Sequence, residues 1–254
     1  MRFLQQTLKS LVAIFAISLP GMVAAAAPAG PCAPLNRDGV AFVVCSFNPG
    51  KSDIRLFWRD DEGQSFAGFD RLADAVAGKG GSLVFAMNAG MYQPDLSPVG
   101  LYVERGQELR PVNRRGGQGN FNLRPNGVFW VRQGAAGVTE TQKFVAQNLR
   151  PDYATQSGPM LVIGGRIHPK IHPDGTSAKI RNGVGVCEDG MVRFVIADDP
   201  VTFYNFASLF VDMKCPDALY LDGSVSALYA PSLKRNDGWK SIGPIVGVVE
   251  GLKK

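Results

Sequence analysis

The sequence lacks the patterns on which several common enzyme classes depend. Histidine occurs only twice and cysteine four times in 254 residues, and no two cysteines form a CxxC pair. A zinc cluster of ordinary spacing is therefore not expected. There is also no GxSxG turn, Walker loop, HExxH helix or Cys/His nucleophile pattern. Their absence argues against the common serine hydrolases, nucleotide-binding enzymes and zinc proteases.

Long apolar runs and blocks of like charge are scarce as well. The run LVAIFAISL is too short to span a bilayer. The basic residues Arg2 and Lys9 precede this run, and the small residues VAAAAPA follow it. Residues 1–26 are therefore predicted to be a cleaved secretory signal. Pro31 stands directly before Cys32, which argues against a lipoprotein. We therefore expect a periplasmic or secreted protein with no stable membrane insertion.

The charge balance gives no indication of a polyanionic partner. Removing residues 1–26 takes away two basic residues and no acidic one, so the formal net charge falls from +5 to +3. That surplus is small and contains no basic run, so we expect no nucleic-acid partner. Residues 27–254 contain no evident repeat or linker and are long enough for one domain with a proper core. The oligomeric state stays open.

The cysteines and the hairpin signals indicate the fold class. Export permits two disulfides among Cys32, Cys45, Cys187 and Cys215; proximity in the sequence favours Cys32–Cys45 and Cys187–Cys215, and buried free thiols are the alternative. Strands are expected at 40–47, 53–58 (as a hairpin partner of 40–47) and 82–87, and near the C-terminus. Hairpins are predicted about Arg105-Gly106, Gly164-Gly165 and Asp189-Gly190, among others.

Two helices are expected, one at about 68–76 capped by Ser65 and one at 202–214 with an apolar stripe that we interpret as core. The predicted fold is thus α+β: a single domain with a largely antiparallel or mixed β-sheet built from hairpins and about two main helices.

The stretch ALYLDGSVSALYAP, residues 218–231, is the first candidate for a site. A buried strand ends at Asp222, and Gly223, Ser224 and Ser226 follow. A carboxylate at the end of a buried strand beside glycine commonly forms part of a site. On the local sequence alone, Asp-Gly as the turn of a hairpin is the more common interpretation.

Four further loop segments place polar residues next to buried strands. Residues 87–100 offer an amide, a glycine and an aromatic wall. Residues 113–127 mix arginines, asparagines and glycines, as anion-binding loops and mobile solvated loops both do. Residues 155–174 contain the histidines, whose flanking prolines exclude a helical metal pair. Residues 179–186 place an arginine at the mouth of a strand. The candidates are Asn88, Gly90, Tyr92, Arg124, Asn126, Ser157, Gly158, His168, Arg181 and Asn182.

Four motifs in order, NAGMY, SGPMLVIGGR, RNGVGV and LYLDGSVS, resemble those of the phosphodiester glycosidase family. This is the catalytic domain type of the "uncovering" enzyme, which removes N-acetylglucosamine from a phosphodiester on mannose. The resemblance covers about residues 40–250 and is closest to small exported bacterial members. The family's Leu-Asp-Gly-Gly-Gly-Ser-Ser loop is shortened here, with Val225 between two serines, and Met91 stands where an aromatic is frequent.

The resemblance implies hydrolysis of a sugar-1-phosphodiester with release of free sugar. We expect no cofactor and no metal ligands, because no spacing ties the carboxylates or histidines together, although whether a divalent ion is bound stays open. Because the leaving phosphate is already a stable anion, cationic and N–H donors should matter more than a strong general acid. Asp222, Arg181 and Asn88 are then the expected catalytic residues and the other candidates the binding residues. Asp222 could act as a base, as a nucleophile or as a binder of sugar hydroxyls. A non-catalytic module that binds envelope glycans and a metal-dependent phosphodiesterase are the alternatives.

Overall fold

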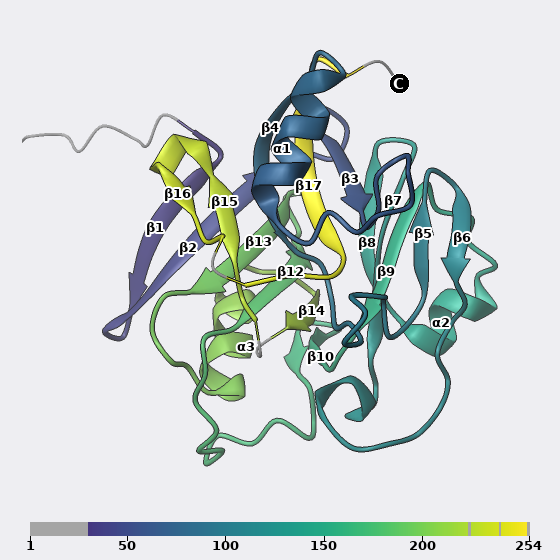
Figure 1. Cartoon of the computed structure of the whole chain (residues 1–254). Helices are drawn as coiled ribbons and strands as arrows, with labels where there is room; N and C mark the ends of the chain where they lie inside the picture. Colours follow the sequence, from purple (N-terminus) through teal and green to yellow (C-terminus); the bar gives the residue numbers. More distant parts are fainter. Residues whose placement is uncertain (1–29, 223–224, 239, 253–254) are drawn as a thin grey trace, which may run out of the picture.

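The computed structural model describes residues 30–222, 225–238 and 240–252 (Figure 1). The predicted signal segment 1–26 and the candidate residues Gly223 and Ser224 lie outside the described residues. Within the described chain, three antiparallel β-sheets are accompanied by three helices, which confirms the predicted α+β class. The helices are α1 (Phe69–Gly78), α2 (Thr141–Ala146) and α3 (Phe203–Asp212).

The order of strands in space differs from their order along the chain in all three sheets. The seven-stranded sheet consists, from edge to edge, of β1 (Cys32–Arg37), β2 (Val40–Phe47), β13 (Val192–Ala197), β12 (Asn182–Val186), β14 (Asp217–Asp222), β10 (Met160–Ile163) and β11 (Arg166–Ile167). One five-stranded sheet consists, in spatial order, of β16 (Arg235–Asn236), β15 (Leu228–Ala230), β4 (Ser82–Asn88), β17 (Ile245–Glu250) and β3 (Asp53–Phe57). The other consists of β6 (Gln107–Arg110), β5 (Tyr102–Glu104), β9 (Tyr153–Ser157), β7 (Gly127–Arg132) and β8 (Ala135–Glu140).

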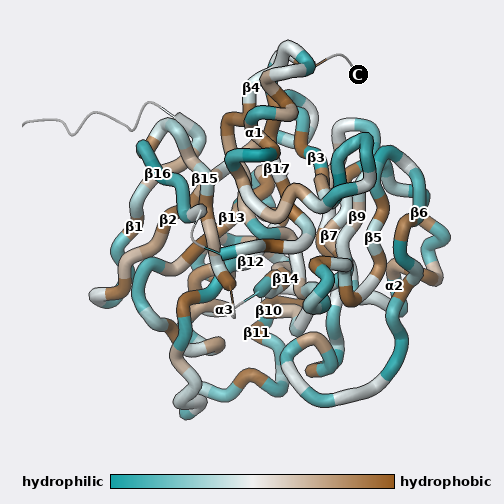
Figure 2. Tube along the Cα trace, viewed as in Figure 1, coloured by the Kyte–Doolittle hydropathy of each residue, from teal (hydrophilic) through white to brown (hydrophobic). Residues whose placement is uncertain are grey.

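The three sheets meet around one central apolar cluster to which each contributes side chains. Phe194 of β13 lies at its centre, with ring centroids 4.9 Å from Phe85 of β4 and 5.6 Å from Phe129 of β7. Each of these rings is at most 1% exposed, so one aromatic from each sheet fixes how the sheets pack. Figure 2 shows the same division along the chain, with hydrophobic segments on the strands and hydrophilic ones at many of the connecting loops.

Each sheet also buries its outer face beneath a helix. α3 packs on the seven-stranded sheet, α1 on the sheet that contains β4, and α2 on the sheet that contains β7. The apolar stripe of α3, with Phe206, Leu209 and Phe210 buried, is core as predicted. A central cluster between the sheets and one helix outside each sheet together account for the α+β architecture.

Several local predictions are confirmed and two, the partner of β3 and the cap of α1, are wrong. The hairpins β5–β6, β7–β8, β10–β11 and β12–β13 form at the predicted turns. Strand β3, however, pairs with β17 near the C-terminus and not with β2, because two buried strands next to each other in sequence need not be neighbours in a sheet. α1 begins at Phe69 with Gly68 before it, so Ser65 is not its cap. Asp222 does not end a hairpin strand, because the next strand, β15, belongs to another sheet.

Both predicted disulfides are present. Cys32 pairs with Cys45 across neighbouring strands β1 and β2, and Cys187 pairs with Cys215. All four sulfurs are thereby used. The second bond joins the β12–β13 turn to the segment between α3 and β14, so it fixes the entry into the strand that carries Asp222.

Candidate active site

The candidate residues converge where strands of all three sheets end. Asn88 is the last residue of β4, Ser157 the last of β9 and Asp222 the last of β14. Asn182 opens β12 and lies opposite Asp222 in the antiparallel register. Four motifs that are far apart in sequence are thus brought together by the packing of three sheets around one core.

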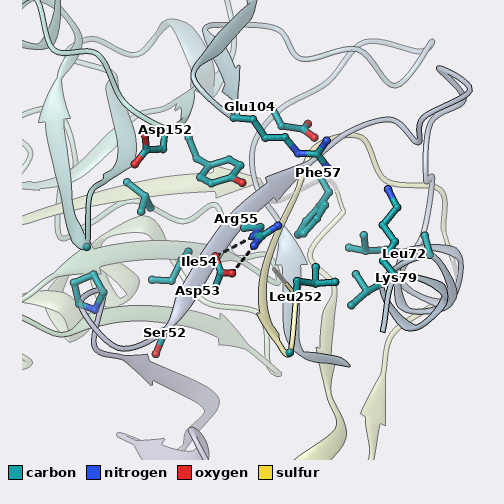
Figure 3. Close-up of a pocket in the computed structure, with 18 of the residues that line it drawn as sticks. Ser52, Asp53, Ile54, Arg55, Phe57, Leu72, Lys79, Glu104, Asp152 and Leu252 are labelled. Carbon is teal, nitrogen blue, oxygen red and sulfur yellow. Dashed lines mark hydrogen bonds and ion pairs between the residues drawn. The ribbon is translucent and has the colours of Figure 1, made fainter. Parts of the chain in front are cut away.

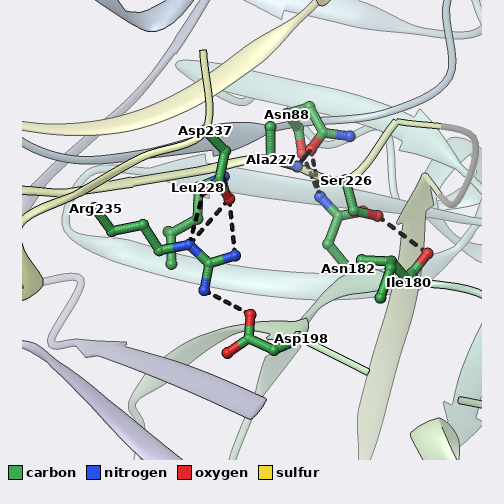
Figure 4. A network of polar contacts seen from close by, with 9 residues as sticks. All are labelled: Asn88, Ile180, Asn182, Asp198, Ser226, Ala227, Leu228, Arg235 and Asp237. Atoms are coloured by element: carbon green, nitrogen blue, oxygen red, sulfur yellow. Dashed lines mark hydrogen bonds and ion pairs between the residues drawn. The ribbon is translucent and has the colours of Figure 1, made fainter. Parts of the chain in front are cut away.

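Two buried amides form the inner layer of this site (Figure 4). Asn88 and Asn182 are both 0% exposed. Asn182 Nδ2 donates to Asn88 Oδ1 at 2.8 Å and to the Asn88 carbonyl at 3.0 Å. Asn88 Nδ2 donates to the Val225 carbonyl at 2.6 Å, and its Oδ1 accepts from the Ala227 N–H at 3.0 Å. Neither amide is therefore at the surface, and both are engaged by protein groups.

Buried hydrogen bonds hold the backbone of Asp222. Its N–H donates to Asn182 Oδ1 at 2.8 Å, and its carbonyl accepts from Ser226 Oγ at 2.9 Å. Ser157 Oγ donates to the carbonyl of the preceding residue, Leu221, at 2.8 Å. The residue is 6% exposed. Its position is therefore set by packing and by buried hydrogen bonds to the backbone, as a residue that must be placed accurately would require.

Arg181 is a buried cation whose described partners are neutral. Its Nε donates to the Val201 carbonyl at 2.8 Å, Nη2 to the Ser177 carbonyl at 2.7 Å and Nη1 to the Tyr220 hydroxyl at 3.3 Å. The guanidinium lies 3.6 Å above the Phe203 ring, and the residue is 1% exposed. No ion pair joins it to a carboxylate among the described residues. Burial lowers the pKa of Arg181, although the Tyr220 hydroxyl acts against this effect.

Two tyrosines lie close enough to Asp222 to feel its charge. Burial raises the pKa of Tyr220 to about 12; the nearby Arg181 guanidinium lowers this pKa and the Asp222 carboxylate raises it. Burial and the same carboxylate also raise the pKa of Tyr92, whose hydroxyl donates to the Ser241 carbonyl at 3.0 Å. The phenols therefore stay neutral at ordinary pH. Asp222, Tyr220 and Arg181 form a connected outer layer of the site.

Tyr220 was missed by the sequence interpretation, although a signal for it exists. Alternate residues of a strand commonly share a face, so the position of Tyr220 two residues before Asp222 was a signal for it. Phe203 was assigned to the core stripe of α3 and in fact also supports the Arg181 guanidinium. Asn120 belongs to the segment of residues 113–127, here called the glycine-rich loop. It contributes a further hydrogen bond that lowers the pKa of Tyr220.

The two candidate residues of the glycine-rich loop, Arg124 and Asn126, bond to groups of the protein in and beside that loop. Arg124 Nη2 donates to the carbonyls of Arg114 and Arg115, the latter at 2.9 Å. Asn126 is 4% exposed; its Nδ2 donates to the Phe121 carbonyl at 3.0 Å, and its Oδ1 accepts from the Thr141 hydroxyl at 2.8 Å. These contacts account for both side chains within the protein, so the geometry gives no direct support to their predicted contact with substrate.

Two candidate glycines allow close packing beside the site. A Cβ on Gly158 would lie 2.6 Å from the Asn126 Cβ, so no larger residue fits without displacement of the backbone there. A Cβ on Gly90 would lie 3.1 Å from Thr155 Oγ1, whose hydroxyl donates to the Ala89 carbonyl. Strand β9 thus anchors the residues around the end of β4, and through Ser157 the end of β14.

His168 is 0% exposed and does not reach the surface of the site. Its Nδ1 accepts from the Lys170 N–H at 3.0 Å, and its Nε2 makes no hydrogen bond within the described chain. Burial lowers the pKa of His168, whereas the neighbouring backbone carbonyl of Arg124 raises it. The imidazole is therefore neutral at ordinary pH, and the predicted substrate contact finds no support in the geometry.

The described residues contain no group of three or more His, Cys, Asp or Glu side chains placed to hold a metal ion. Three carboxylates, Asp198, Asp199 and Asp95, have local partners instead. Asp198 forms an ion pair with Arg235 at 2.6 Å, and Asp199 accepts from the Ala41 N–H at 2.9 Å. Asp95 accepts from the Ser97 N–H at 3.0 Å.

A hollow of about 1200 Å³ lies elsewhere, beside strand β3 (Figure 3). Its lining mixes apolar side chains of β3 and α1 with charged ones. Asp53 and Arg55 form a two-point ion pair at 2.6 and 2.9 Å, and Lys79 contacts Asp61 at 2.6 Å. Burial raises the pKa of Glu104, which accepts from the Tyr102 hydroxyl at 3.0 Å. None of the predicted site residues lines this hollow.

Comparison with known proteins places the chain in a family. The pattern of the phosphodiester glycosidase family matches residues 81–248, and the chain belongs to that family of glycosidase-type hydrolases. The uncharacterized protein YigE of Escherichia coli (strain K12) is 36% identical over 183 residues, which cover 72% of this chain and 71% of YigE. The family resemblance inferred from the four motifs is thereby confirmed.

Solved structures share the fold. The catalytic domain of zebrafish N-acetylglucosamine-1-phosphodiester alpha-N-acetylglucosaminidase, auto-inhibited by its pro-peptide, superposes with a TM-score of 0.62 at 13% identity, covering 88% of this chain and 82% of that one. A hypothetical protein of Synechocystis gives 0.55 at 14% identity over 86% and 61% of the two chains. A Burkholderia pseudomallei protein named for its expected export gives 0.52 at 12% identity over 82% and 74%. None of the described helices is long and apolar enough to cross a bilayer.

Proposed function

We propose that this protein is an exported phosphodiester glycosidase that hydrolyses a sugar-1-phosphodiester and releases free sugar. The observation that carries the proposal is a buried strand-end carboxylate near a buried cation whose described hydrogen-bond partners are neutral. Asp222 and Arg181 are linked through the Tyr220 hydroxyl, which bonds to Arg181 and lies within the field of Asp222. A carboxylate beside a cation suits a substrate in which a developing positive centre is joined to a phosphate.

Arg181 suits the phosphate because of its lack of a described carboxylate partner. A buried charge is costly unless it is paired. Its three described hydrogen bonds use three of the five N–H groups of a guanidinium, and their acceptors carry no net charge. An arriving phosphate would supply the missing counter-charge and could accept from a planar fork.

Asp222 then faces the sugar. In the proposed reaction a water molecule adds to the anomeric carbon, the carbon–oxygen bond to phosphate breaks, and the phosphate leaves as an anion that needs little protonation. The carboxylate would stabilise the positive charge that develops at the anomeric carbon, or would take the proton of the attacking water. Tyr92 is partly exposed beside this carboxylate, so its neutral ring is available as a wall for the sugar.

The deciding experiment is incubation of the mature protein with a sugar-1-phosphodiester, with and without a chelator. Free sugar released at a rate that the chelator does not change supports the proposal. Release of sugar phosphate that the chelator abolishes would instead indicate a metal-dependent phosphodiesterase. Binding without turnover would indicate a glycan-binding module.

Export is proposed from two features together. Both cysteine pairs are oxidised, which is typical of proteins outside the reducing cytosol, and residues 1–26 have the pattern of a secretory signal. Expression of the full chain in a bacterium, followed by fractionation and mass spectrometry, should recover a shortened periplasmic or secreted protein without free thiols. Full-length protein with four free thiols in the cytosol would contradict this part of the proposal.

A further inference from the structure

Asn182 links the ends of two sheets through a single side chain. Its Nδ2 donates to the carbonyl and to Oδ1 of Asn88 at the end of β4, and its Oδ1 accepts from the N–H of Asp222 at the end of β14. It is 0% exposed, so these contacts are shielded from water, where hydrogen bonds are hardest to replace.

The direction of these hydrogen bonds is fixed by the neighbours. Asn88 Nδ2 points at the Val225 carbonyl. Asn88 Oδ1 points at the Ala227 N–H (Figure 4). If the Asn88 amide were flipped, its Nδ2 would face the Ala227 N–H, donor against donor, and its Oδ1 would face the Val225 carbonyl, acceptor against acceptor. Asn88 therefore offers only acceptor atoms to Asn182. Residue 182 must in turn donate toward Asn88 while it accepts from Asp222, which an amide does and a carboxylate does not.

The two amides consequently hold both ends of the loop that follows β14. Asn182 holds Asp222 at the start of the loop, and Asn88 holds Val225 and Ala227 at its end. The chain beyond is fixed as well, because the Leu228 N–H donates to Asp237 at 3.0 Å and Asp237 pairs with Arg235. One buried relay thus joins the described residues on either side, from Ala227 through Asn88 and Asn182 to Asp222.

We propose that Asn182 is a positioning residue: it does not touch substrate, and it sets the position of Asp222 through the Asn88–Asn182 relay. This inference rests on the proposed function of Asp222 for its catalytic consequence. It differs from the expectation that Asn182 binds substrate, since a fully buried amide with protein partners on both sides offers no atom to a ligand.

Asn182→Asp tests the relay through pH. As a carboxylate, the new side chain lacks a donor and faces two Asn88 oxygens; as a carboxylic acid it donates to Asn88 and still accepts from the Asp222 N–H. A buried carboxyl has a raised pKa, so the change falls within an accessible range. We expect the ratio of its kcat to that of the native protein to fall by about tenfold or more between pH 5 and pH 9, with KM little changed. Asn205→Asp, a matched change at an exposed residue of α3, should give a flat ratio near one.

A second readout needs no substrate. In Asn182→Asp, amide hydrogen exchange across residues 225–228 should speed up as pH rises, relative to native protein at the same pH, while the interior of β12 stays protected. If native protein cleaves no phosphodiester, the proposed function fails, and exchange still decides the positioning role. If native protein is active, then a flat kcat ratio with unchanged exchange, or an effect on KM alone, overturns the inference and leaves the function standing.

Should Asn182→Asp fail to fold, Asn182→Ser replaces it. A serine hydroxyl lies on a shorter side chain and cannot span both contacts, and it introduces no charge. It should lower kcat at every pH with KM retained, and should speed exchange of the same loop. Native kcat or a rise in KM alone in this variant would refute the positioning role.

Discussion

The strand ends around Asp222 and the hollow beside β3 both gather charged side chains, but they neutralise them differently. In the hollow two ion pairs neutralise four of the charged side chains, Arg55 with Asp53 and Lys79 with Asp61. At the Asp222 end, the Arg181 guanidinium bonds only to two carbonyls and a phenol among the described residues. The Asp222 end thus holds a cation that is 1% exposed and whose described hydrogen-bond partners are all neutral.

This difference in pairing affects where an ionic ligand would gain the most binding free energy. Charges that are already paired must give up their partners before they can bind an ion, so the net gain is small. A buried cation among neutral dipoles has already lost its water and gains fully from an anion. The presence of a cavity would point to the hollow as the binding site. The buried cation with only neutral described partners points instead to Arg181. Substitutions in the two regions can test that contrast, beginning with the largest expected effect.

Asp222→Asn should abolish most of the activity. The amide keeps the size of the side chain, and the backbone bonds to Asn182 and Ser226 do not depend on its charge. We expect a normal melting temperature and a loss of turnover of about a hundredfold or more, the scale of losing one key electrostatic contact. Both quantities should be measured on the same purified sample. Near-native turnover in well-folded protein would end the catalytic assignment.

Arg181→Lys should have the next largest effect. Lysine keeps the positive charge but cannot bond at once to the Val201 and Ser177 carbonyls and to a phosphate, because it lacks the planar fork. We expect kcat/KM to fall by about tenfold or more, mainly through KM, with some loss of thermal stability. Inhibition by inorganic phosphate should weaken in parallel. A native rate together with native phosphate inhibition would make Arg181 purely structural.

Tyr220 should make stability depend on pH in the alkaline range. Its pKa rises from about 10 in the unfolded chain to about 12 in the folded protein, so folding favours the neutral phenol. The contribution of the neutral Tyr220 phenol to the free energy of unfolding is complete below pH 10 and is lost as pH rises through 12. The unfolding free energy of the native protein should therefore fall relative to that of Tyr220→Phe between pH 10 and 12, by up to about 2–3 kcal/mol.

Urea unfolding at pH 9 and pH 11 measures this difference, and the other tyrosines cancel because both proteins contain them. An equal gap at both pH values would show that Tyr220 is not shielded as the structure has it.

The fold was predictable from sequence where contacts are local. Hairpins such as β12–β13 need only alternating apolar residues and a turn such as Asp189-Gly190, and these were found. The pairing of β3 with β17 was not, because it joins segments about 190 residues apart and nothing local specifies the partner. For the same reason the Asp-Gly of residues 222–223 resembled a hairpin turn, although the chain passes there into a different sheet.

For the candidate site, the sequence indicated which residues to consider but not which contacts they make. Ordered motifs identified Asn88, Arg181, Asn182 and Asp222 because family resemblance carries long-range information that spacing does not. Their individual roles depend on contacts, and only the structure shows that Asn182 bonds to Asn88 and not to the surface. Side chains that looked available for binding, such as Arg124 and Asn126, turn out to hold their own loop.

The smallest effect on turnover is expected from the same chemical change made in the hollow. Asp53→Asn removes one carboxylate from a side-chain pair that is 26% exposed at Asp53 and 11% at Arg55, and it leaves the Arg55 guanidinium with a weaker neutral acceptor. The Asp53 carboxylate raises the pKa of Arg55, so its removal should cost stability, by about 1 kcal/mol for a partly exposed pair.

Turnover of Asp53→Asn, however, should stay within about twofold of native, because no residue of the hollow contributes to the Asp222 site. Measured beside Asp222→Asn, it compares one isosteric loss of charge at each region, with melting temperature as the common control. A tenfold or greater loss of turnover in folded Asp53→Asn would reverse the comparison, since the paired charges beside β3 would then belong to the reaction and the hollow would be where substrate binds.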